Sequence, residues 1–485
     1  MDRSPATGET DPARAGIGAA VVGGLAAVAV AIRLPAVLSA PALVFDDGQY
    51  GVSVVDMRHG LVPYRDLFSS QGPLHYPLLY LGDLLALRTI DGPRVTPLLA
   101  GVFVTLGIAA VARRLGATRA VAIVCALLVA TTGTMIWTTA QVTGDGPAAA
   151  LVVGVCWAAL AYRDDPRWWR AVLTGAVFGA LVAVKPLAVG VVIPAGWWLG
   201  SRRRAGDVIG AGVAAVGVWF ASALPWGLTR VWDQSVAYHL GKAAEHTKAY
   251  NLGKLATTLA QRDTVILGAL ALGAVAALVG SRDGAGGRED DPERRADLVV
   301  VGVWAAVVVL MLVLETVLFT NHVAALVIPL VLLIALRPPP LRWLAAGLVV
   351  LVPVMAWTTI DFVRPRHYIG AEAELVAALR ALPAGATAIS DDPQYVWRAG
   401  RSTPPMMNDV SAMRFDQGSL TTADIVDAAR RPGNCAVVIW SERFATMAPG
   451  LREGLAGAGY GLARSFGPDR ELWTRAPCPA ARAAG

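Results

Sequence analysis

The sequence predicts a polytopic α-helical membrane protein in which residues 363–485 form a small α/β domain outside the membrane. Three observations support this prediction. Hydrophobic residues make up 55% of the 485 residues and charged residues only 16%, whereas soluble domains contain about 25% charged residues. Long apolar runs alternate with short charged segments from Gly16 to Asp361. Beyond Arg364 the composition becomes that of an ordinary soluble domain.

The apolar runs define the candidate transmembrane helices. A helix needs about 20 residues to cross the hydrocarbon core, and fewer when neighbouring helices shelter it. We count about 11 candidates by hydropathy, which are 16–36, 94–112, 118–137, 147–162, 171–184, 187–200, 207–227, 264–280, 298–318, 323–336 and 342–361. No convincing Ala-x-Ala site follows the first run, so we expect a retained anchor and not a cleaved signal peptide.

Arginine residues indicate the orientation, because basic residues collect in cytoplasmic loops. They cluster in five short loops, near residues 113–119, 163–170, 202–204, 282–295 and 337–342. If all five are cytoplasmic, each intervening segment must cross an even number of times, and the predicted helices satisfy this condition. The N-terminus is then cytoplasmic and the C-terminal domain lies outside. These loops also account for the net charge of +6, which therefore indicates no nucleic-acid partner.

The apolar segment 73–87 is not counted as a crossing, because it would place Arg113 and Arg114 or the first long loop on the wrong side. We expect it to lie in the outer interface, with Tyr76 and Tyr80 at headgroup level. Three polar loops then face outward, at 37–93, 138–146 and 228–263. The first is long, and long loops in compact proteins are usually functional.

Two adjacent carboxylates, Asp46 and Asp47, begin the long outer loop directly after the first predicted helix. Close like charges raise the pKa of one carboxyl group, which can then take up or share a proton near neutral pH. A structural role is equally open, in which Asp46 caps the following helix and Asp47 remains solvated.

The order of motifs in this loop resembles that of one glycosyltransferase family. Asp-Asp-Gly-Gln-Tyr at 46–50 is followed by Tyr-Arg-Asp-Leu-Phe at 64–68 and by Gly-Pro-Leu-His-Tyr at 72–76. This arrangement is similar to the first outer loop of the dolichyl-phosphate-mannose–protein mannosyltransferase and lipid A aminoarabinose transferase family, within the GT-C superfamily. Family members commonly have Asp-Glu-x-x-Tyr and Lys-Pro-Pro-Leu at these places. Here Asp47 replaces the glutamate, and Gln71-Gly72 replaces the Lys-Pro pair.

The resemblance implies a GT-C-like transmembrane glycosyltransferase domain over 1–362 and a polyprenyl-phosphate-linked sugar donor. It implies that Asp46 is the base acting on the acceptor hydroxyl, with Asp47 in a supporting or metal-contacting role. Whether a divalent cation takes part stays open; if one does, Asp46 and Asp47 are its expected ligands. From the same loop we expect substrate binding by Tyr50, Tyr64, Arg65, Asp66 and His75.

Two charged residues outside this loop are further candidates for substrate binding. Lys185 interrupts the apolar segment 171–200 at its outer apex, and a lysine at membrane depth indicates function and an anionic partner such as a lipid phosphate. Snorkelling of Lys185 to water is the alternative. Asp145, in the second outer loop, would line the same cavity or cap the helix that opens with Pro147, and of these the cap is slightly favoured.

Glu315 and His322 are the last candidates for substrate binding, near the outer end of 298–318. A membrane glutamate usually faces a polar cavity or a cation, although pairing with Lys185 or Arg33 would be purely structural. In the third outer loop, His239 and His246 stand seven residues apart, on one helical face. No acidic ligand is suitably spaced beside them, so we expect no metal site there.

The C-terminal domain shows alternating helix and strand patterns. We expect helices at 371–381, 421–431 and 447–457, and strands at 386–390, 435–440, near 459–466 and at 470–475. This alternation predicts an α/β layer with a largely parallel sheet. The glycine-rich segment 457–461 follows a helix and not a strand, so we interpret it as a helix C-cap and turn and not as a dinucleotide loop.

Cys435 and Cys478 are the cysteines of this outer domain, in a compartment that favours disulfides. Cys435 begins a predicted strand and Cys478 follows the last one, so neighbouring strand ends would bring them together. Two free thiols are the alternative, because pairing requires Cα atoms within about 7 Å.

Together these features predict a hexosyl- or pentosyltransferase that acts at the outer face of the cytoplasmic membrane on a cell-envelope glycan, lipid or protein. The high content of Ala, Arg and Gly is typical of a high-GC bacterium, and therefore of a polyprenyl carrier. A flippase for a lipid-linked molecule is the alternative, but transporters carry charges deep in several spans, whereas the polar residues here gather at the outer ends. The two departures from the family motifs keep a non-catalytic scaffold as a third possibility.

Overall fold

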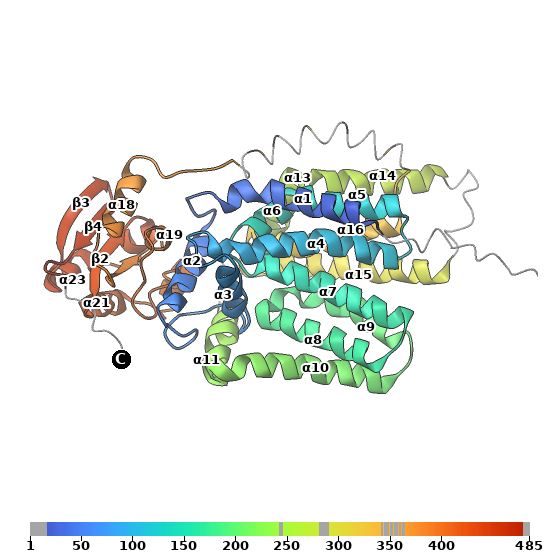
Figure 1. The fold of residues 1–485 in the computed structure, drawn as a ribbon, viewed down its shortest axis with the longest axis horizontal. Coiled ribbons are helices and arrows are strands. Elements are labelled where there is room, and N and C mark those ends of the chain that lie inside the picture. The colour runs from blue at the N-terminus through green and yellow to red at the C-terminus, as the bar shows by residue number, and fades with distance from the viewer. Residues whose placement is uncertain are drawn as a thin grey trace, which may run out of the picture.

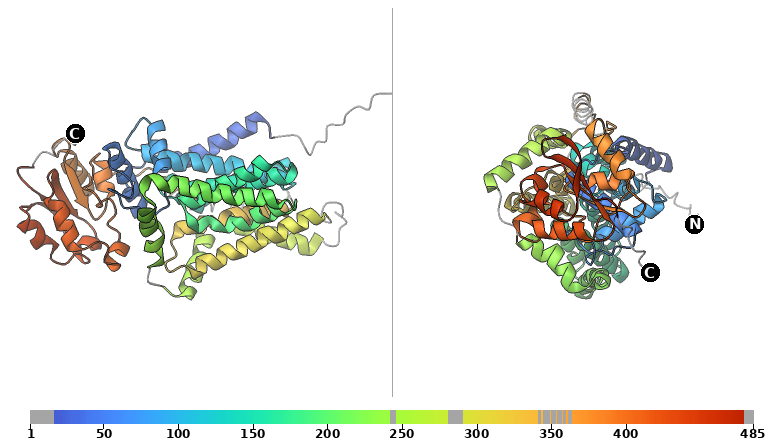
Figure 2. Two further views of the ribbon diagram at one scale, coloured as in Figure 1. Left: turned by 90° about the horizontal axis from the view of Figure 1, so that it is seen from below. Right: turned by 90° about the vertical axis from the view of Figure 1, so that its left-hand side faces the viewer.

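The computed structural model describes residues 17–241, 246–280, 291–340 and 364–478, with five single residues between 343 and 360. A bundle of helices runs along the long axis of the molecule, and an α/β part occupies one end (Figure 1). Figure 2 shows the same arrangement from two further sides, with the helices of the long outer loop 37–93 between the two parts.

The helices of the bundle follow the predicted apolar runs. They are α1 (Ala19–Val37), α4 (Val95–Arg114), α5 (Arg119–Thr131), α6 (Gly133–Ala140), α7 (Asp145–Asp164), α8 (Trp168–Val184), η3 (Pro186–Val191), α9 (Val192–Gly200), α10 (Ala205–Ala223), α13 (Lys248–Arg262), α14 (Thr264–Gly280), α15 (Pro292–Leu314), η6 (Thr320–Val323) and α16 (Ala324–Leu336). Two short turns of helix, α11 (Leu228–Trp232) and α12 (Tyr238–Leu240), come between α10 and α13. The predicted crossing 342–361 lies almost entirely outside the described residues.

Length and composition support a polytopic membrane protein. Five helices in the described ranges are long and apolar enough to cross a membrane, and up to seven crossings result if each bent pair is one span. The bent pairs are α5–α6, with an angle of 60°, and α13–α14, with an angle of 92°. The segments of α8, of η3 with α9, and of η6 with α16 are shorter and apolar. The total of 11 crossings stays a prediction.

The short helix α16 lies at the centre of the bundle, where neighbouring helices surround it. α16 contains no charged residue, and nearly all its side chains are buried. It packs against α5, α7 and α15 within the largest apolar cluster. A helix that is apolar all round is stable only when protein or lipid surrounds it.

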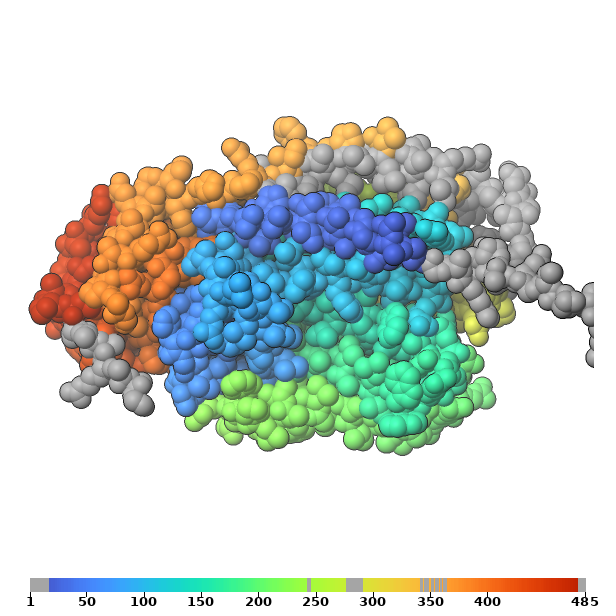
Figure 3. Space-filling view, in the orientation of Figure 1, coloured from blue at the N-terminus to red at the C-terminus, as the bar shows by residue number. Residues whose placement is uncertain are grey.

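The long outer loop forms two helices, α2 (Phe45–Arg58) and α3 (His75–Leu85). The 11 residues of α3 are too few to cross the hydrocarbon core alone. One face of α2 carries two glycines that permit close packing against the α/β part. A Cβ atom on Gly51 would lie 2.4 Å from the ring of Trp397, and one on Gly48 would lie 2.8 Å from the backbone nitrogen of Gln394. Figure 3 shows the loop, in blue, directly beside the orange α/β part.

The α/β part has a four-stranded sheet with the order β1-β2-β4-β3. Its elements are α18 (Ala371–Arg380), β1 (Thr387–Ser390), α19 (Gln394–Arg398), α20 (Ala412–Asp416), α21 (Thr422–Arg430), β2 (Asn434–Ile439), α22 (Glu442–Ala445), α23 (Leu451–Gly457), β3 (Gly461–Gly467) and β4 (Arg470–Thr474). The helix and strand predictions therefore agree with the structure to within a few residues, and Gly459 turns the chain after α23 with φ of 85°.

The prediction of a largely parallel sheet is wrong. Only β1 and β2 run parallel, while β4 pairs antiparallel with both β2 and β3. The physical reason is the short connection between β3 and β4, because a tight turn can join only antiparallel strands. The prediction treated alternation of helix and strand as parallel crossovers and overlooked this terminal hairpin.

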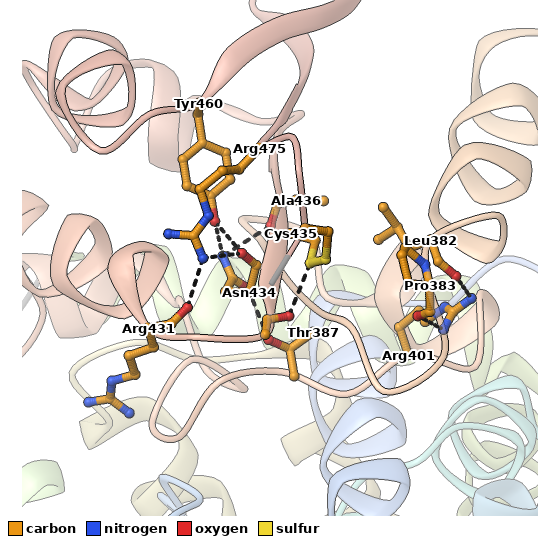
Figure 4. The surroundings of a disulfide bond; sticks show 12 residues. Leu382, Pro383, Thr387, Arg401, Arg431, Asn434, Cys435, Ala436, Tyr460 and Arg475 are labelled. Carbon is orange, nitrogen blue, oxygen red and sulfur yellow. Dashed lines mark hydrogen bonds between the residues drawn. A yellow bond between two sulfur atoms is a disulfide. The ribbon is translucent and has the colours of Figure 1, made fainter. Parts of the chain in front are cut away.

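Cys435 and Cys478 are joined in a disulfide, with Cα atoms 5.3 Å apart (Figure 4). Cys435 lies at the start of β2, and Cys478 follows β4, the strand next to β2. Beside the disulfide, the guanidinium group of Arg475 donates 3.0 Å hydrogen bonds to the carbonyl oxygens of Arg431 and Asn434. These contacts hold the end of the described chain against the sheet.

Candidate active site

Asp46 stands in the first turn of α2 with its side chain partly buried. The helix has Val44 as its N-cap, so the interpretation of Asp46 as the capping residue is wrong. Burial raises the pKa of Asp46 to about 6, with Lys185 and His322 acting to lower it and Asp409 and Asp145 acting to raise it. Within the described residues the Asp46 carboxylate has no hydrogen-bond or ion-pair partner, so it is free to accept a proton.

Asp47 has a structural environment. Its side chain is fully buried and forms an ion pair with Arg94, which is also fully buried. The carboxylate also accepts hydrogen bonds from the backbone nitrogens of Val142 at 2.8 Å and Leu43 at 3.0 Å. The interpretation of Asp47 as a solvated residue is therefore wrong, because Arg94, the residue directly before α4, compensates its charge.

The contacts of Asp47 also decide whether its carboxylate could bind a metal ion. Both oxygens of Asp47 are occupied by protein donors, and the adjacent guanidinium would repel a cation. Across the part of the chain that the structure describes, no group of three or more His, Cys, Asp or Glu side chains is arranged to hold a metal. The pair Asp46 and Asp47 therefore does not fit the metal-ligand role considered for it.

Lys185 and Asp145 form a buried charged pair that interacts electrostatically with Asp46. The Nζ atom of Lys185 lies 2.6 Å from Oδ1 of Asp145, and both side chains are about nine-tenths buried. Asn321 donates a 2.6 Å hydrogen bond to the other carboxylate oxygen of Asp145. Lys185 therefore does not snorkel to water. Gly144, not Asp145, is the N-cap of α7, so the preferred interpretation of Asp145 as a cap is wrong: compensation of the buried lysine charge outweighs a cap.

The first outer loop reaches this charged pair through an unusually close backbone contact. The backbone nitrogens of Gly72 and Leu74 donate to the carbonyl oxygens of Val184 and Ala183, at 3.2 and 2.9 Å. A Cβ atom on Gly72 would lie 2.2 Å from the Ala183 oxygen. Only glycine permits this approach, which places Gln71 and its neighbours beside the helix break that presents Lys185.

Gln71, His75 and Lys185 converge on Gly144. A Cβ atom added there would lie 3.2 Å from Oε1 of Gln71, 3.5 Å from Nδ1 of His75 and 3.7 Å from Cδ of Lys185. Gln71 also donates a 2.9 Å hydrogen bond to the hydroxyl of Tyr50, whose ring packs edge-on against His75. His75 and Tyr50 thus lie beside Gln71 and Lys185, and their role in substrate binding stays a prediction.

The remaining candidates for substrate binding pair with one another or bond within the first outer loop. Glu315 pairs with His322 at 2.7 Å, and His322 faces Asp46 and Asp145. Arg65, with 56% of its side chain exposed, pairs with its neighbour Asp66 at 2.7 Å. The Tyr64 hydroxyl donates a 2.6 Å hydrogen bond to the Gln71 carbonyl. We conclude that the Tyr64-Arg65-Asp66 turn shapes the loop.

An apolar groove begins beside Lys185 and Asp145. It is open on one side, has a cavity volume of about 20 Å³ and lies between α7, η3 and α16. Its remaining lining consists of small and branched apolar side chains, from Ala148, Ala149, Val152, Leu187, Ala188, Ala324, Ala325 and Ile328. A charged pair therefore stands at one end of a small apolar groove.

The α/β part contributes residues to the surroundings of α2 that no sequence pattern indicates. Asn408 donates hydrogen bonds of 2.9 Å to Ser53 Oγ on α2 and to the carbonyl oxygen of Phe68. Asp409 accepts a 2.7 Å hydrogen bond from Gln49, also on α2. Gln49 and Asp409 are 360 residues apart in the sequence, so no local pattern could have revealed the contact.

Comparison with solved structures defines the class of fold. ArnT from Cupriavidus metallidurans, crystallised with undecaprenyl phosphate, has a TM-score of 0.64 at 14% identity, covering 96% of this chain and 100% of that chain. An oligosaccharyltransferase from Archaeoglobus fulgidus has a TM-score of 0.52 at 11% identity, covering 91% and 72%. The arabinofuranosyltransferase AftD from Mycobacteria has a TM-score of 0.54 at 15% identity, and this chain, covered to 96%, spans 40% of it. The fold is that of the GT-C superfamily.

Within that class, the family model described as dolichyl-phosphate-mannose-protein mannosyltransferase matches residues 70–226. A search of curated proteins gives no match. The resemblance predicted from the first outer loop is therefore confirmed, and the matched segment contains Gln71, His75, Asp145 and Lys185.

Proposed function

We propose that this protein is a membrane glycosyltransferase that transfers a sugar from a polyprenyl-phosphate carrier to a cell-envelope acceptor. The observation that carries the proposal is an arrangement centred on Lys185: its buried cation interacts electrostatically with the Asp46 carboxylate and also lines the small apolar groove. An amphiphile with an anionic head and a hydrocarbon tail matches the cation and the groove. The similar fold of ArnT, crystallised with undecaprenyl phosphate, supports this choice of carrier.

The proposed reaction is an inverting displacement. The acceptor hydroxyl oxygen forms a bond to the anomeric carbon of the sugar, and the bond from that carbon to the phosphate oxygen breaks. Asp46 takes the proton of the hydroxyl group, as a general base with a pKa near 6 can do at neutral pH. The electron pair of the broken bond leaves with the phosphate, whose charge Lys185 stabilises.

His75 is suited to bind the donor as a neutral group. Burial, reinforced by the charge of Lys185, lowers the pKa of His75 to about 3. Neither ring nitrogen has a hydrogen-bond partner among the described residues. The desolvation cost of these buried polar atoms is therefore not compensated. A phosphate oxygen or a sugar hydroxyl would satisfy the ring N–H.

The departure from the family's Lys-Pro-Pro-Leu motif has a physical explanation in this cavity. Gln71 stands where family members carry lysine, and it bonds to Tyr50. Lys185 approaches the same point from the break between α8 and η3. The positive charge therefore comes from the break between α8 and η3 and not from the first outer loop. This supports an intact donor site over a non-catalytic scaffold.

We also propose the placement of the chain in the cell membrane. Residues 1–362 would form the membrane domain and residues 363–485 an extracytoplasmic domain, with the N-terminus in the cytoplasm. The arginine loops support this orientation. The helix α2, which carries Asp46, lies at the end of the bundle next to the α/β part (Figure 1), and a site at one end of the bundle favours an interfacial enzyme over a flippase. A reporter active only outside should be active after Gly485 and silent after Arg204.

The test of function uses membranes that contain the full-length protein and a panel of radiolabelled polyprenyl-phosphate sugars. At least one sugar should appear in an envelope acceptor with the wild-type protein and not with Asp46→Asn. Product analysis by thin-layer chromatography and intact mass would identify the sugar and the acceptor. Equal transfer by the wild type and by Asp46→Asn would refute the assignment of this cavity.

A further inference from the structure

The α/β part grips α2 along its length, which is the helix that carries Asp46. At the far end of α2, the fully buried Asp56 accepts hydrogen bonds from Ser402 Oγ at 2.5 Å, from the Thr403 backbone nitrogen at 2.7 Å and from Thr403 Oγ1 at 2.6 Å. In the middle, Gly51 lies against Trp397. Near the start, Gln49 holds Asp409. Each turn of the helix is therefore fixed by a residue of the α/β part.

The segment 402–411 inserts a carboxylate beside Asp46. Gln49 follows Asp46 by three residues on α2, so the two side chains share one face of the helix. The Nε2 atom of Gln49 donates a 2.7 Å hydrogen bond to Oδ2 of Asp409, and the backbone nitrogen of Ser411 donates to Oδ1 at 2.9 Å. Only 2% of Asp409 is exposed to solvent. A buried carboxylate is thus hydrogen-bonded to a residue that lies one helical turn from the candidate base.

We propose that Asp409 belongs to the catalytic cavity and acts as a positioning residue whose fixed negative charge keeps the Asp46 carboxylate basic. The inference rests on the proposed function of Asp46 and extends it to the α/β part. The donors that fix the Asp409 carboxylate are neutral, so none of these hydrogen bonds comes from a counter-ion. Asp145, by contrast, is offset by its ion pair with Lys185.

The other charged and titratable groups around Asp46 come from four elements. Lys185 approaches from the break after α8, Asp145 from α7 and His322 from η6, while Tyr50 lies on α2 itself. Tyr238 of α12 faces both Asp46 and Asp409. Arg414 interacts electrostatically with Asp409, and its guanidinium group donates to the backbone oxygen of Asp409. Burial and Asp409 therefore act together to raise the pKa of Asp46, against Lys185 and His322.

The test measures the titration of Asp46 directly and does not require transfer activity. Infrared difference spectra of the purified full-length protein, recorded across pH, contain a carboxylic-acid band that Asp46→Asn removes and that therefore belongs to Asp46. In Asp409→Asn the midpoint of this band should move to lower pH by about 0.5 to 1 unit, because one like charge has been removed. Asp409→Glu should leave it within about 0.3 units, since the charge is retained.

Asp416→Asn is the matched control, because Asp416 is exposed on α20 of the same part and its loss should not shift the midpoint. Asp409→Ser is a second neutral variant, used if Asp409→Asn does not fold. Where transfer is measurable, the acid limb of kcat/KM should shift in parallel. An unchanged midpoint in both neutral variants overturns the role of Asp409, whatever the transfer assay gives. Absence of transfer in the wild type would instead count against the proposed function alone.

Discussion

The Nζ atom of Lys185 lies 2.6 Å from Oδ1 of Asp145, and Asn321 holds the second oxygen of the same carboxylate. The lysine occurs at a break between α8 and η3, where Pro186 cannot donate a backbone hydrogen bond. The protein thus gives a buried lysine an internal counter-ion. A donor phosphate would meet a cation that Asp145 has already oriented, which reduces the entropic cost of binding.

The first prediction separates stability from donor binding at this pair. Lys185→Met leaves Asp145 buried and unpaired, so the free energy of unfolding should fall by about 3 to 5 kcal/mol. The double variant Lys185→Met/Asp145→Leu should regain most of this loss, because a buried pair can be replaced by apolar groups. Neither variant should bind the donor with wild-type affinity, since both lack the cation. Thermal unfolding and a binding titration with polyprenyl phosphate check the two effects, and wild-type affinity in the double variant would contradict the donor site.

The second prediction concerns Asp46. Asp46→Asn keeps the shape of the side chain but cannot accept the proton, so turnover should fall by about 10²- to 10⁴-fold while donor affinity is retained. In the wild type the ionised form is the active one, and its pKa is raised to about 6 by burial. The value of kcat/KM should therefore fall about tenfold per pH unit below pH 6 and level off above it. A pH–rate profile without this acid limb would exclude Asp46 as the base.

The third prediction distinguishes Asp47 from its neighbour. Asp47→Asn removes the counter-ion of the fully buried Arg94, which also donates to the carbonyl oxygens of Ala36, Val37, Ser39 and Pro41. The thermal unfolding temperature should drop, because a buried charge loses its partner. Turnover of the folded fraction should fall much less than in Asp46→Asn. If Asp47→Asn instead remains stable but loses turnover, the roles of the two acids are reversed.

Local patterns in the sequence predict a large part of this fold. Apolar runs mark the bundle helices because burial in lipid requires them, and alternating patterns mark α18, β1, α21, β2, β3 and β4 to within a few residues. Motif and membrane depth also indicate Asp46, Lys185 and His75, and the structure brings Asp46 and His75 within electrostatic reach of Lys185. Their catalytic and binding roles stay predictions. The direction of β4 escaped prediction because strand pairing depends on the connection and not on the pattern within a strand.

The partners of the selected residues could not be predicted. Asp47 meets Arg94 and Asp145 meets Lys185, each across tens of residues of sequence. Asp409 reaches Gln49 from another part of the fold. No periodicity encodes such contacts, because tertiary packing brings together residues that share no local pattern. The interpretations of Asp46 and Asp145 as helix caps failed for the same reason: a cap is a local contact, and buried charges are governed by distant ones.

The fourth prediction concerns the disulfide of the α/β part. Cys125 and Cys156 are buried free cysteines in the bundle, whereas Cys435 and Cys478 are bonded. Unreduced protein in denaturant should therefore show two reactive thiols, rising to four after reduction. Because the bond closes a loop with a sequence separation of 43, its loss in Cys478→Ser should cost up to about 4 kcal/mol of stability. Four thiols before reduction would reject the bond.

The last prediction tests the backbone contact that brings the first outer loop to Lys185. In Gly72→Ala, a Cβ atom would lie 2.2 Å from the Ala183 carbonyl oxygen. The loop must then withdraw, which breaks the bonds from Gly72 and Leu74 to Val184 and Ala183. A displacement near 1 Å in a catalytic site can lower the rate about 100-fold. We therefore expect kcat/KM to fall on this scale, with donor affinity reduced because His75 and Gln71 move with the loop.

Gly253→Ala is the matched control, since no atom lies within 4 Å of a Cβ atom added at that position of α13. Its activity should remain within about twofold of the wild type, because an alanine in a helix is favourable. If Gly72→Ala and Gly253→Ala are equally active, the loop tolerates displacement and the cavity does not depend on this contact. If Gly72→Ala alone loses transfer while its thermal unfolding is nearly unchanged, the contact serves to position the loop and not to stabilise the fold.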